Sequence, residues 1–488
     1  MKKEELRMKK FKVSFYNLFV IFFFALPAWA GYPENARYTD EASKIFWFMQ
    51  ISDTHVGEGI DGGTQDTENL NWITGPAFEV IAPEFIVLTG DITDSTNGGI
   101  IPNGPFQAEW DTYRNLLIGN GITADILYDL PGNHDQYNDG ELAFYLNNSI
   151  QGAATGQSQH SWALEYDFGV YHFLGVATCG DDGRPFPVDN TGLNAAELGF
   201  AESELTAHAD ANLTFTFGHH PIENFLHGAA EFENLLANYG VSLYSFGHIH
   251  GYDVYWMDDT LRFNLASLGK SPDHQYALYA VDNDGLAVNW GNVNEWPLIV
   301  ITAPLDLGLG GGNPFTYVVS ADYEANPVRV LVFDEITPSF VRFRVNDGDW
   351  IPMTDANDPL WEGTFDARPL AAGLTTLEVQ ANGSSSKTQI IHFNLDVTAC
   401  YDGQDNDSDG FIDYPDDPGC YSPSDQNEAD HPPADDDTTD DDTVDDDTVD
   451  DDQALNDDVA TDDDSADDDS TGDDSGDDDK EGSGSCCG

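Results

Sequence analysis

The stretch FMQISDTH, from Phe48 to His55, is the segment from which the fold of this chain can be worked out. Its apolar residues Phe48, Met49 and Ile51 are typical of a buried strand. The strand then runs into Asp53 and His55, two residue types that ligate metals. A strand that ends in such side chains predicts a binding site at the edge of a sheet.

Four other segments repeat this arrangement, because each is a short apolar run followed by glycine and polar residues. They are FIVLTGD up to Asp91, ILYDLPGNHD up to Asp135, TFTFGHHP up to Pro221 and LYSFGHIH up to His250. Such strands alternate with helical segments, 106–118 and 194–208, which predicts an α/β domain with buried sheets. Ligands at the carboxyl ends of its strands converge on one crevice.

The residue types at these strand ends are aspartate, asparagine and histidine, which together suit manganese, iron or zinc ions. They are too numerous for one tetrahedral site. A carboxylate between two histidine-rich sets indicates two metals that share it as a bridge. Paired metals can hold a hydroxide and clamp a phosphoryl group, so the pattern predicts phosphate-ester chemistry.

Taken in order, the motifs D-x-H, GD, GNHD, GHH and GHxH resemble those of the calcineurin-like metallophosphoesterases. The resemblance implies a four-layer α-β-β-α sandwich, in which two mixed sheets lie between outer helices. It also implies a dinuclear centre of manganese, iron or zinc. One metal would be held by Asp53, His55 and His250, the other by Asn133, His219 and His248, and Asp91 would bridge the two.

The resemblance gives His134 a role in chemistry rather than in metal binding. It would face the phosphate and act as general acid or charge stabiliser for the leaving group. Asp135 would either orient His134 or cap a turn. Asp94 stands where purple acid phosphatases carry a ligating tyrosine, which argues against a charge-transfer iron site.

The segments FWFMQISDTHV, GNHD and NEWPLIVITAP narrow the resemblance to the transmembrane protein 62 family, over about residues 46–397. Members of that family are exported proteins whose phosphoesterase domain precedes an immunoglobulin-like domain. Beyond residue 397 no segment resembles the family's C-terminal membrane helices. We therefore expect a metallophosphoesterase domain at 31–296 and an all-β, immunoglobulin-like sandwich at 297–397, where short strands and turn residues alternate.

The two ends of the chain have compositions of their own. A positive region, an apolar run and Ala28-Trp29-Ala30 predict a signal peptide at 1–30, with an uncleaved anchor as the alternative. No other segment is apolar enough to span a bilayer. Residues 431–488 are rich in aspartate and threonine and should be a disordered acidic tail.

Residues 398–430 form an aspartate-rich segment in which Cys400 and Cys420 are the expected disulfide pair. Its sequence DNDSDGFIDYPD has the ligand spacing of a calcium loop but no flanking helices, as in thrombospondin type 3 or dockerin modules. The alternative is a solvated acidic linker. The possible calcium ligands are Asp405, Asp407, Asp409, Asp413 and Asp416.

The formal net charge of −71 makes binding of nucleic acid through a basic surface unfavourable. Together with the signal peptide, the sequence predicts an exported enzyme, which is either secreted or located at the cell surface or in the periplasm. It would be a metal-dependent phosphoric ester hydrolase with a metal-bridging hydroxide, acting on monoesters or diesters. The alternative is a surface-bound scaffold with a vestigial phosphoesterase fold.

Overall fold

The computed structural model describes residues 44–429, except 58–64, 181–183, 189, 271, 310–312, 314, 358 and 421. The predicted signal peptide and the predicted acidic tail lie outside these residues. The described residues belong to one compact unit, which extends to Pro433. Within them, no helix has both the length and the apolar character that a membrane span requires.

The first sheet contains the strand of the opening stretch. Its order is β11-β10-β1-β2-β3, with β1, β2 and β3 parallel and β10 antiparallel to β1. The bounds are β1 Ile45–Ile51, β2 Ile86–Thr89, β3 Leu127–Leu130, β10 Gln275–Asp282 and β11 Gly285–Asn292. The three parallel strands therefore end on the same edge, where the polar motifs begin.

The second sheet has the order β4-β5-β6-β7-β9-β8, and its inner strands β5, β6, β7 and β9 are parallel. The bounds are β4 His160–Tyr166, β5 Gly169–Gly175, β6 Leu213–Phe217, β7 Leu243–Phe246, β8 Asp253–Met257 and β9 Thr260–Asn264. Strands β6 and β7 carry the GHHP and GHIH motifs at their carboxyl ends.

Aromatic side chains join the two sheets face to face. Phe48 of β1 is fully buried, and its ring lies 5.3 Å from that of Phe173 on β5 and 5.6 Å from that of Phe215 on β6. Tyr279 of β10 stacks on the same ring at 4.9 Å. The apolar residues of the opening stretch are thus the centre of the core.

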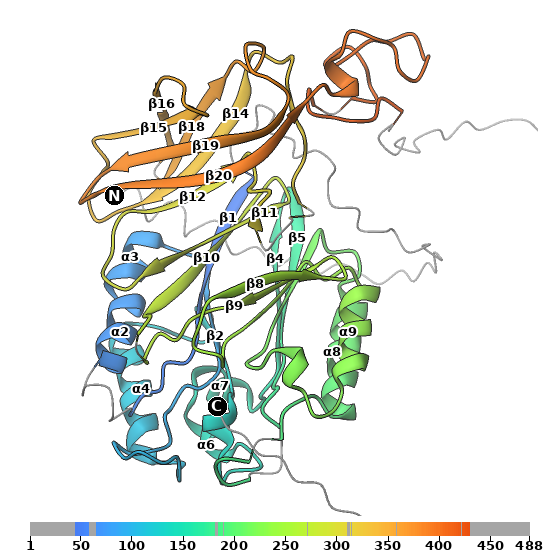
Figure 1. The fold of residues 1–488 in the computed structure, drawn as a ribbon. Coiled ribbons are helices and arrows are strands. Elements are labelled where there is room, and N and C mark those ends of the chain that lie inside the picture. The colour runs from blue at the N-terminus through green and yellow to red at the C-terminus, as the bar shows by residue number, and fades with distance from the viewer. Residues whose placement is uncertain are drawn as a thin grey trace, which may run out of the picture. The chain divides into compact units, whose positions relative to one another are not determined.

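Helices cover the outer faces of both sheets (Figure 1). Helices α2 (Gln65–Thr74), α3 (Pro76–Ile81) and α4 (Gln107–Gly119) lie against the first sheet, and α8 (Ala195–Ala207) and α9 (Ala229–Asn238) against the second. Among the described residues, this α/β part also contains the short helices α5 Asn133–Gln136, α6 Ala143–Asn148, α7 Ile150–Thr155 and η1 Ile222–Asn224. The predicted α/β fold with mixed sheets is confirmed.

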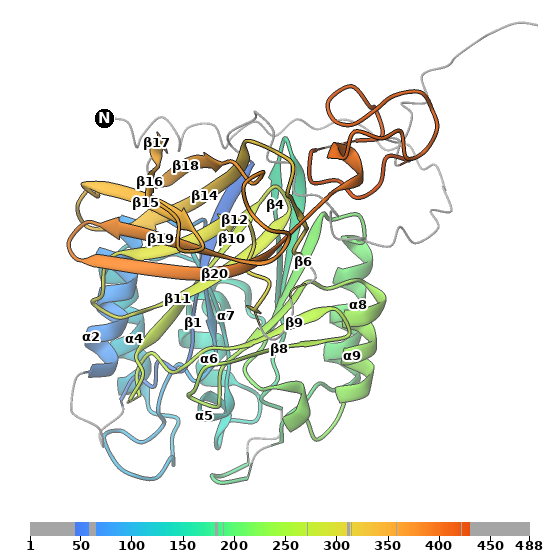
Figure 2. The ribbon, with the colours of Figure 1, turned by 45° about the horizontal axis from the view of Figure 1, so that its top comes forward.

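The β-rich C-terminal region consists of two sheets around a core of their own. Their orders are β12-β14-β18-β17 and β13-β20-β19-β15-β16. The bounds are β12 Leu298–Ala303, β13 Val319–Ser320, β14 Asn326–Phe333, β15 Phe340–Val345, β16 Ile351–Pro352, β17 Thr354–Asn357, β18 Leu360–Phe365, β19 Gly373–Asn382 and β20 Ser386–Asp396. Figure 2 shows these strands as two layers, whose immunoglobulin-like relationship stays a prediction.

The first of these sheets also packs on the α/β part of the chain. Leu331 and Phe333 of β14 are buried in the same core as Phe48, and the ring of Trp47 contacts that of Phe333 at 5.6 Å. Arg329 of β14 donates to the buried carboxylate of Asp282 on β10 at 2.8 Å. The outward face of this sheet is therefore buried as well as its inward face.

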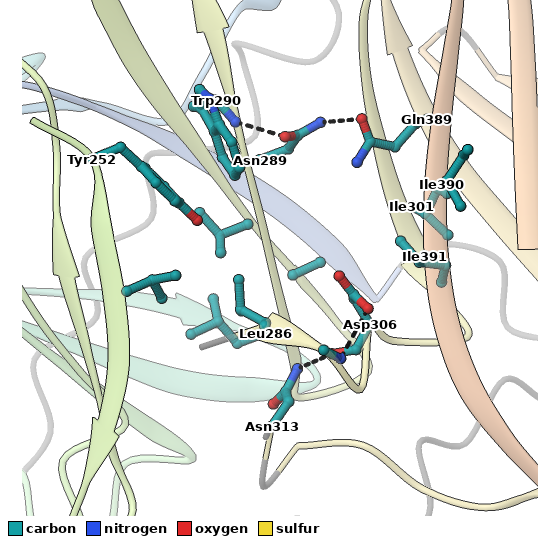
Figure 3. Close-up of a pocket in the computed structure, with 15 residues that line it drawn as sticks. Tyr252, Leu286, Asn289, Trp290, Ile301, Asp306, Asn313, Gln389, Ile390 and Ile391 are labelled. Carbon is teal, nitrogen blue, oxygen red and sulfur yellow. Dashed lines mark hydrogen bonds between the residues drawn. The ribbon is translucent and has the colours of Figure 1, made fainter. Parts of the chain in front are cut away.

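A cavity of about 270 Å³ lies where the two parts meet. Figure 3 shows Tyr252 and Trp290 on one side of it and Gln389 of β20 on the other. Asn289 of β11 links the two sides, because its side-chain amide donates to the Gln389 side-chain oxygen at 3.2 Å.

After β20 the chain forms a compact acidic module at residues 398–429, which begins with the short helix η3 (Ala399–Tyr401). The predicted disulfide joins Cys400 to Cys420, with 5.6 Å between their Cα atoms. Cys179 is a buried free thiol.

Candidate metal centre

The loops that follow β1, β2, β6 and β7 hold one another through their backbones. The amide of Asp53 donates to the Gly90 carbonyl at 3.0 Å, and that of His55 to the Asp91 carbonyl at 2.9 Å. On the second sheet, the Gly247 amide donates to the His219 carbonyl at 3.0 Å. These bonds join the D-x-H loop to the GD loop, and the GHxH loop to the GHH loop.

Many of the predicted ligands have a left-handed backbone, which non-glycine residues rarely adopt. Their φ angles are 51° at Asp53, 44° at His55, 49° at Asp91, 72° at His248 and 56° at His250. Each such residue costs of order 1 kcal/mol. The sharp turn at each strand end is what directs these side chains into a common space.

The first predicted ligand set is brought together in the structure. His250 Nε2 lies 3.2 Å from Asp53 Oδ1 and 3.1 Å from His55 Nε2. His55 Nε2 lies 3.5 Å from Asp91 Oδ2. These are the separations expected between ligands that share one ion at about 2.0–2.2 Å.

The second predicted set converges on the side-chain oxygen of Asn133. His219 Nε2 and His248 Nδ1 each lie 3.1 Å from this oxygen. His219 Nε2 also lies 3.3 Å from Asp91 Oδ1. The two oxygens of Asp91 therefore belong to different ligand sets, which is the arrangement of a bridging carboxylate.

The donor chemistry of these residues fits metal ions. His55 Nδ1 is held by Asp94 Oδ1 at 2.9 Å, and His219 Nδ1 by the Thr89 carbonyl at 2.7 Å. Each contact fixes the proton on Nδ1 and leaves the Nε2 lone pair facing the centre. Lone pairs and buried carboxylates that face one another repel unless a cation lies between them.

The same electrostatics are visible in the titration of the histidines. Burial acts to lower the pKa of His55 and of His219, but the neighbouring carboxylates outweigh it and raise each pKa to about 9. At His134 burial prevails and lowers the pKa to about 4. Without a metal ion, the carboxylates thus favour protons on these two ligand histidines, which a bound cation would displace, whereas His134 stays neutral.

His134 lies next to the predicted ligands without belonging to their sets. Its Nδ1 contacts the Asp94 carbonyl at 2.8 Å, and its Nε2 lies 4.0 Å from Asp91 Oδ2. Its side chain is 13% exposed, so the ring lies at the open side of the centre. A substrate could reach Nε2 from there.

Asp135 has the contacts of the turn-capping alternative. Its carboxylate accepts from the backbone amides of Ile92, Thr93 and Gly132, at 2.9–3.0 Å. The nitrogen through which a carboxylate would orient His134 is engaged by Asp94 instead. Asp135 therefore ties the GD loop to the GNHD loop.

Two residues near the centre are absent from the sequence-based assignment. His220 is fully buried, with Nε2 3.2 Å from the Asn133 side-chain oxygen and Nδ1 3.0 Å from the Thr178 hydroxyl. Lys270 Nζ lies 3.0 Å from Asp94 Oδ1 and is 20% exposed. The second histidine of GHHP was a signal for His220, whereas no motif marks Lys270.

The five predicted calcium ligands lie apart from this centre, in the acidic module. Asp405, Asp409 and Asp416 are exposed, and Asp407 and Asp413 are half-exposed. Their carboxylates mostly accept from amides of the same loop; Asp405, for example, accepts from Gly410 at 3.2 Å. Whether these five hold calcium stays a prediction.

Comparison with known proteins agrees with this geometry. Residues 46–252 match the family model of the calcineurin-like phosphoesterases. The chain is 23% identical over 364 residues to Transmembrane protein 62 of Mus musculus, which covers 72% of this chain and 55% of the relative. It is 25% identical over 225 residues to a metallophosphoesterase-like protein of Arabidopsis thaliana, covering 42% and 30%.

The chain thus spans about half the length of the first of these relatives and less of the second. Among solved structures, GAP50, the anchor in the inner membrane complex of Plasmodium, aligns with a TM-score of 0.36 and 14% identity, covering 51% of this chain and 85% of that chain. That similarity is too low to carry an argument. Residues 46–252 therefore form a domain that matches the calcineurin-like phosphoesterases, and over 72% of its length the chain is similar to Transmembrane protein 62.

Proposed function

We propose that this protein is a metal-dependent hydrolase of phosphate esters with two metal ions at the centre described above. The observation that carries the proposal is the position of Asp91, whose two carboxylate oxygens face two separate ligand sets. When bound, two such ions would lower the pKa of a shared water and offset charge on a phosphoryl group.

The protein's own residues would bind the substrate and move its proton. Lys270 and His134 both flank Asp94 on the open side of the centre, so they are placed to contact phosphoryl oxygens. His134 is neutral at neutral pH without substrate, because its pKa is about 4. An adjacent phosphoryl anion would raise that pKa, so that Nε2 could carry a proton to the leaving oxygen.

Export is part of the proposal. It rests on the sequence of residues 1–30, which precede the described part of the chain. The described residues contribute one supporting observation, the disulfide between Cys400 and Cys420, since such bonds persist in oxidising compartments.

The test is metal content and hydrolysis measured on the same preparations. We expect about two ions per chain in the wild type, together with turnover of an aryl phosphodiester or phosphomonoester. Asp91→Asn should lose both metal and turnover. Asp125→Asn, a matched change at an exposed position in the α4–β3 loop, should lose neither.

The scaffold alternative makes the opposite prediction. A wild-type chain that binds no metal after reconstitution with manganese, iron or zinc would support it. So would a chain that binds two ions but hydrolyses none of a panel of monoesters and diesters. Asp91→Asn with two ions and normal turnover would instead remove the bridging role.

A further inference from the structure

The acidic module at residues 398–429 contains nine acidic residues and no lysine, arginine or histidine. Most of its carboxylates are at the surface, where water screens their repulsion. Asp417, Asp425 and Glu428 differ from these, because they are only 1%, 1% and 2% exposed. The module thus buries three carboxylates without enclosing a positive side chain of its own.

Asp417 and Glu428 each have one oxygen that is satisfied and one that is not. Asp417 Oδ1 accepts from the Gly419 amide at 2.7 Å, and a Glu428 oxygen accepts from the Asn406 amide. The other oxygens, Asp417 Oδ2 and Glu428 Oε1, are buried and have no hydrogen-bond partner among the described residues. Buried oxygens of this kind are uncommon in native proteins, and a bound ion or an ordered water is a usual partner for them.

The two side chains are close enough to share one ion. Asp417, Cys420 and Glu428 each offer an atom within 4.8 Å of the others. Cys420 is in the disulfide, so its sulfur is not available as a thiolate and the oxygens are the usable ligands. Two buried carboxylates at this separation cost several kcal/mol unless a cation or a proton lies between them.

The backbone fixes this pair in place. A Cβ atom on Gly419 would lie 1.5 Å from the Glu428 carbonyl oxygen, so the two segments touch. The Cys400 amide donates to the Asp425 carbonyl at 3.1 Å, and the Tyr414 amide to the Cys400 carbonyl at 2.9 Å. Two carboxylates from different turns are thus held together around the disulfide, inside the module.

We propose that the acidic module binds one calcium ion through Asp417 and Glu428, and that these two residues, rather than the exposed aspartates of the 405–416 loop, are its principal ligands. An all-oxygen site with carboxylates and nearby backbone carbonyls suits calcium, which accepts irregular geometry and six to eight ligands. The absence of nitrogen and thiolate ligands in the module makes zinc or copper a poorer fit.

The site would stabilise the module and has no part in hydrolysis. Calcium would bind the folded module and not the unfolded chain, so it should protect the Cys400–Cys420 disulfide from reduction. The exposed carboxylates of the module and the many aspartates of residues 431–488 would add only weak, unsaturable binding. That background is the same in every full-length variant, so differences between variants report the site.

The experiment is a calcium titration of the full-length protein, followed by calorimetry and by the rate at which dithiothreitol opens the disulfide. We expect one saturable site in the wild type. Asp417→Asn and Glu428→Gln should each weaken it more than about tenfold. The matched changes Asp407→Asn and Asp409→Asn, at a half-exposed and an exposed aspartate of the loop, should alter its affinity less than about twofold.

The rate of disulfide reduction without calcium shows whether the variants are still folded. The neutral variants remove a repulsion there, so their disulfides should be reduced no faster than that of the wild type. Calcium should slow reduction in the wild type and leave the two buried-site variants unchanged. Turnover of phosphate esters should be normal in all of them.

Three results would overturn the proposal. One is a wild-type disulfide whose reduction rate does not respond to millimolar calcium, even if the variants are unstable. Another is a saturable site that survives both buried changes. The third is a site that is lost in Asp407→Asn or Asp409→Asn alone, which would return the site to the exposed loop.

Discussion

His134 lies beside the predicted metal ligands but outside their two sets. Its Nδ1 is engaged by the Asp94 carbonyl, and its Nε2 lies 4.0 Å from Asp91 Oδ2. We expect His134→Gln to lower turnover by about a hundredfold or more, the usual scale for loss of a general acid, without changing metal content. Steady-state kinetics and metal analysis would measure the two effects separately.

The way in which the loss of turnover in His134→Gln depends on the leaving group distinguishes a general acid from a residue that only stabilises charge. A nitrophenolate leaves without protonation, so the loss should be smaller for nitrophenyl esters than for alkyl esters. Equal losses for both would argue that His134 stabilises charge and donates no proton. His160→Gln, a change at a buried histidine that contacts Tyr145 outside the centre, is the control for general disturbance of the fold.

Lys270 places a positive charge beside the predicted ligands, because it forms an ion pair with Asp94. Its ammonium group lies 3.0 Å from Asp94 Oδ1, which in turn holds His55. Lys270→Met should raise KM about tenfold for dianionic monoesters and less for diesters, because a diester carries one charge fewer. Lys387→Met, at a half-buried lysine of β20, should leave KM unchanged. A fall in kcat at constant KM would contradict the binding role.

Some residues of the centre could be predicted from the sequence and others could not. The seven predicted ligands lie in short motifs with fixed spacing, so they could be predicted, and the structure brings them together. Lys270 could not, because it lies in a loop after β9 with no motif around it and reaches Asp94 only through the tertiary fold. Asp135 was ambiguous, since a carboxylate after GNH has the same sequence whether it orients a ring or caps a turn.

At the scale of elements, the strand-end loops combine function with backbone strain. His250 has φ of 56°, a conformation that alanine tolerates poorly and glycine adopts freely. In metal-free protein we therefore expect His250→Gly to be more stable than His250→Ala by up to about 1 kcal/mol. Urea denaturation in the presence of a chelator would measure the difference.

The same two substitutions at His392, on β20, provide the control. His392 lies within that extended strand and is exposed, so glycine there should be less stable than alanine by about 0.5–1 kcal/mol. The sign of the Gly–Ala difference should thus reverse between the two positions. If alanine were more stable at both, the left-handed turn at His250 would not be a source of strain.

Helix boundaries were among the features that the sequence predicts well. The helix expected at 194–208 is observed as α8, Ala195–Ala207, because Asn194 and Glu197 form a reciprocal cap at its start. Strand β4 was not among the strands named from the sequence. Its residues HSWALEY have no continuous apolar run, and most are only half-buried because β4 is at the edge of its sheet.

At the scale of the whole molecule, the α/β part and the β-rich part share buried groups. Asp282 is fully buried and accepts from Arg329 and from the Thr302 hydroxyl, both in the β-rich part. Arg329→Met would leave a buried carboxylate without its cation, which costs about 3–5 kcal/mol. We expect activity and β-sheet signal to be lost together, at one lowered temperature.

Arg368 offers the comparison for a surface ion pair. It pairs with Asp366 at 55% exposure, so Arg368→Met should cost no more than about 1 kcal/mol. Activity and circular dichroism during heating would record both variants. Two separate transitions in Arg329→Met would mean that the shared core does not couple the two parts. The sequence could not predict this interface. Alternation of apolar and polar residues along a strand predicts that one face of a sheet is buried, whereas both faces of the sheet that contains β14 are buried.

The aromatic contact beside the cavity of Figure 3 makes part of the molecule an optical reporter. Tyr252 follows His250 by two residues, and its ring stacks on the indole of Trp290 at 4.1 Å. We therefore expect a change in the position of His250 to alter the surroundings of a fluorophore on β11. The difference in emission between the wild type and Trp290→Phe should respond when manganese or zinc is added, so loading of the centre could be followed by fluorescence, without substrate and in real time.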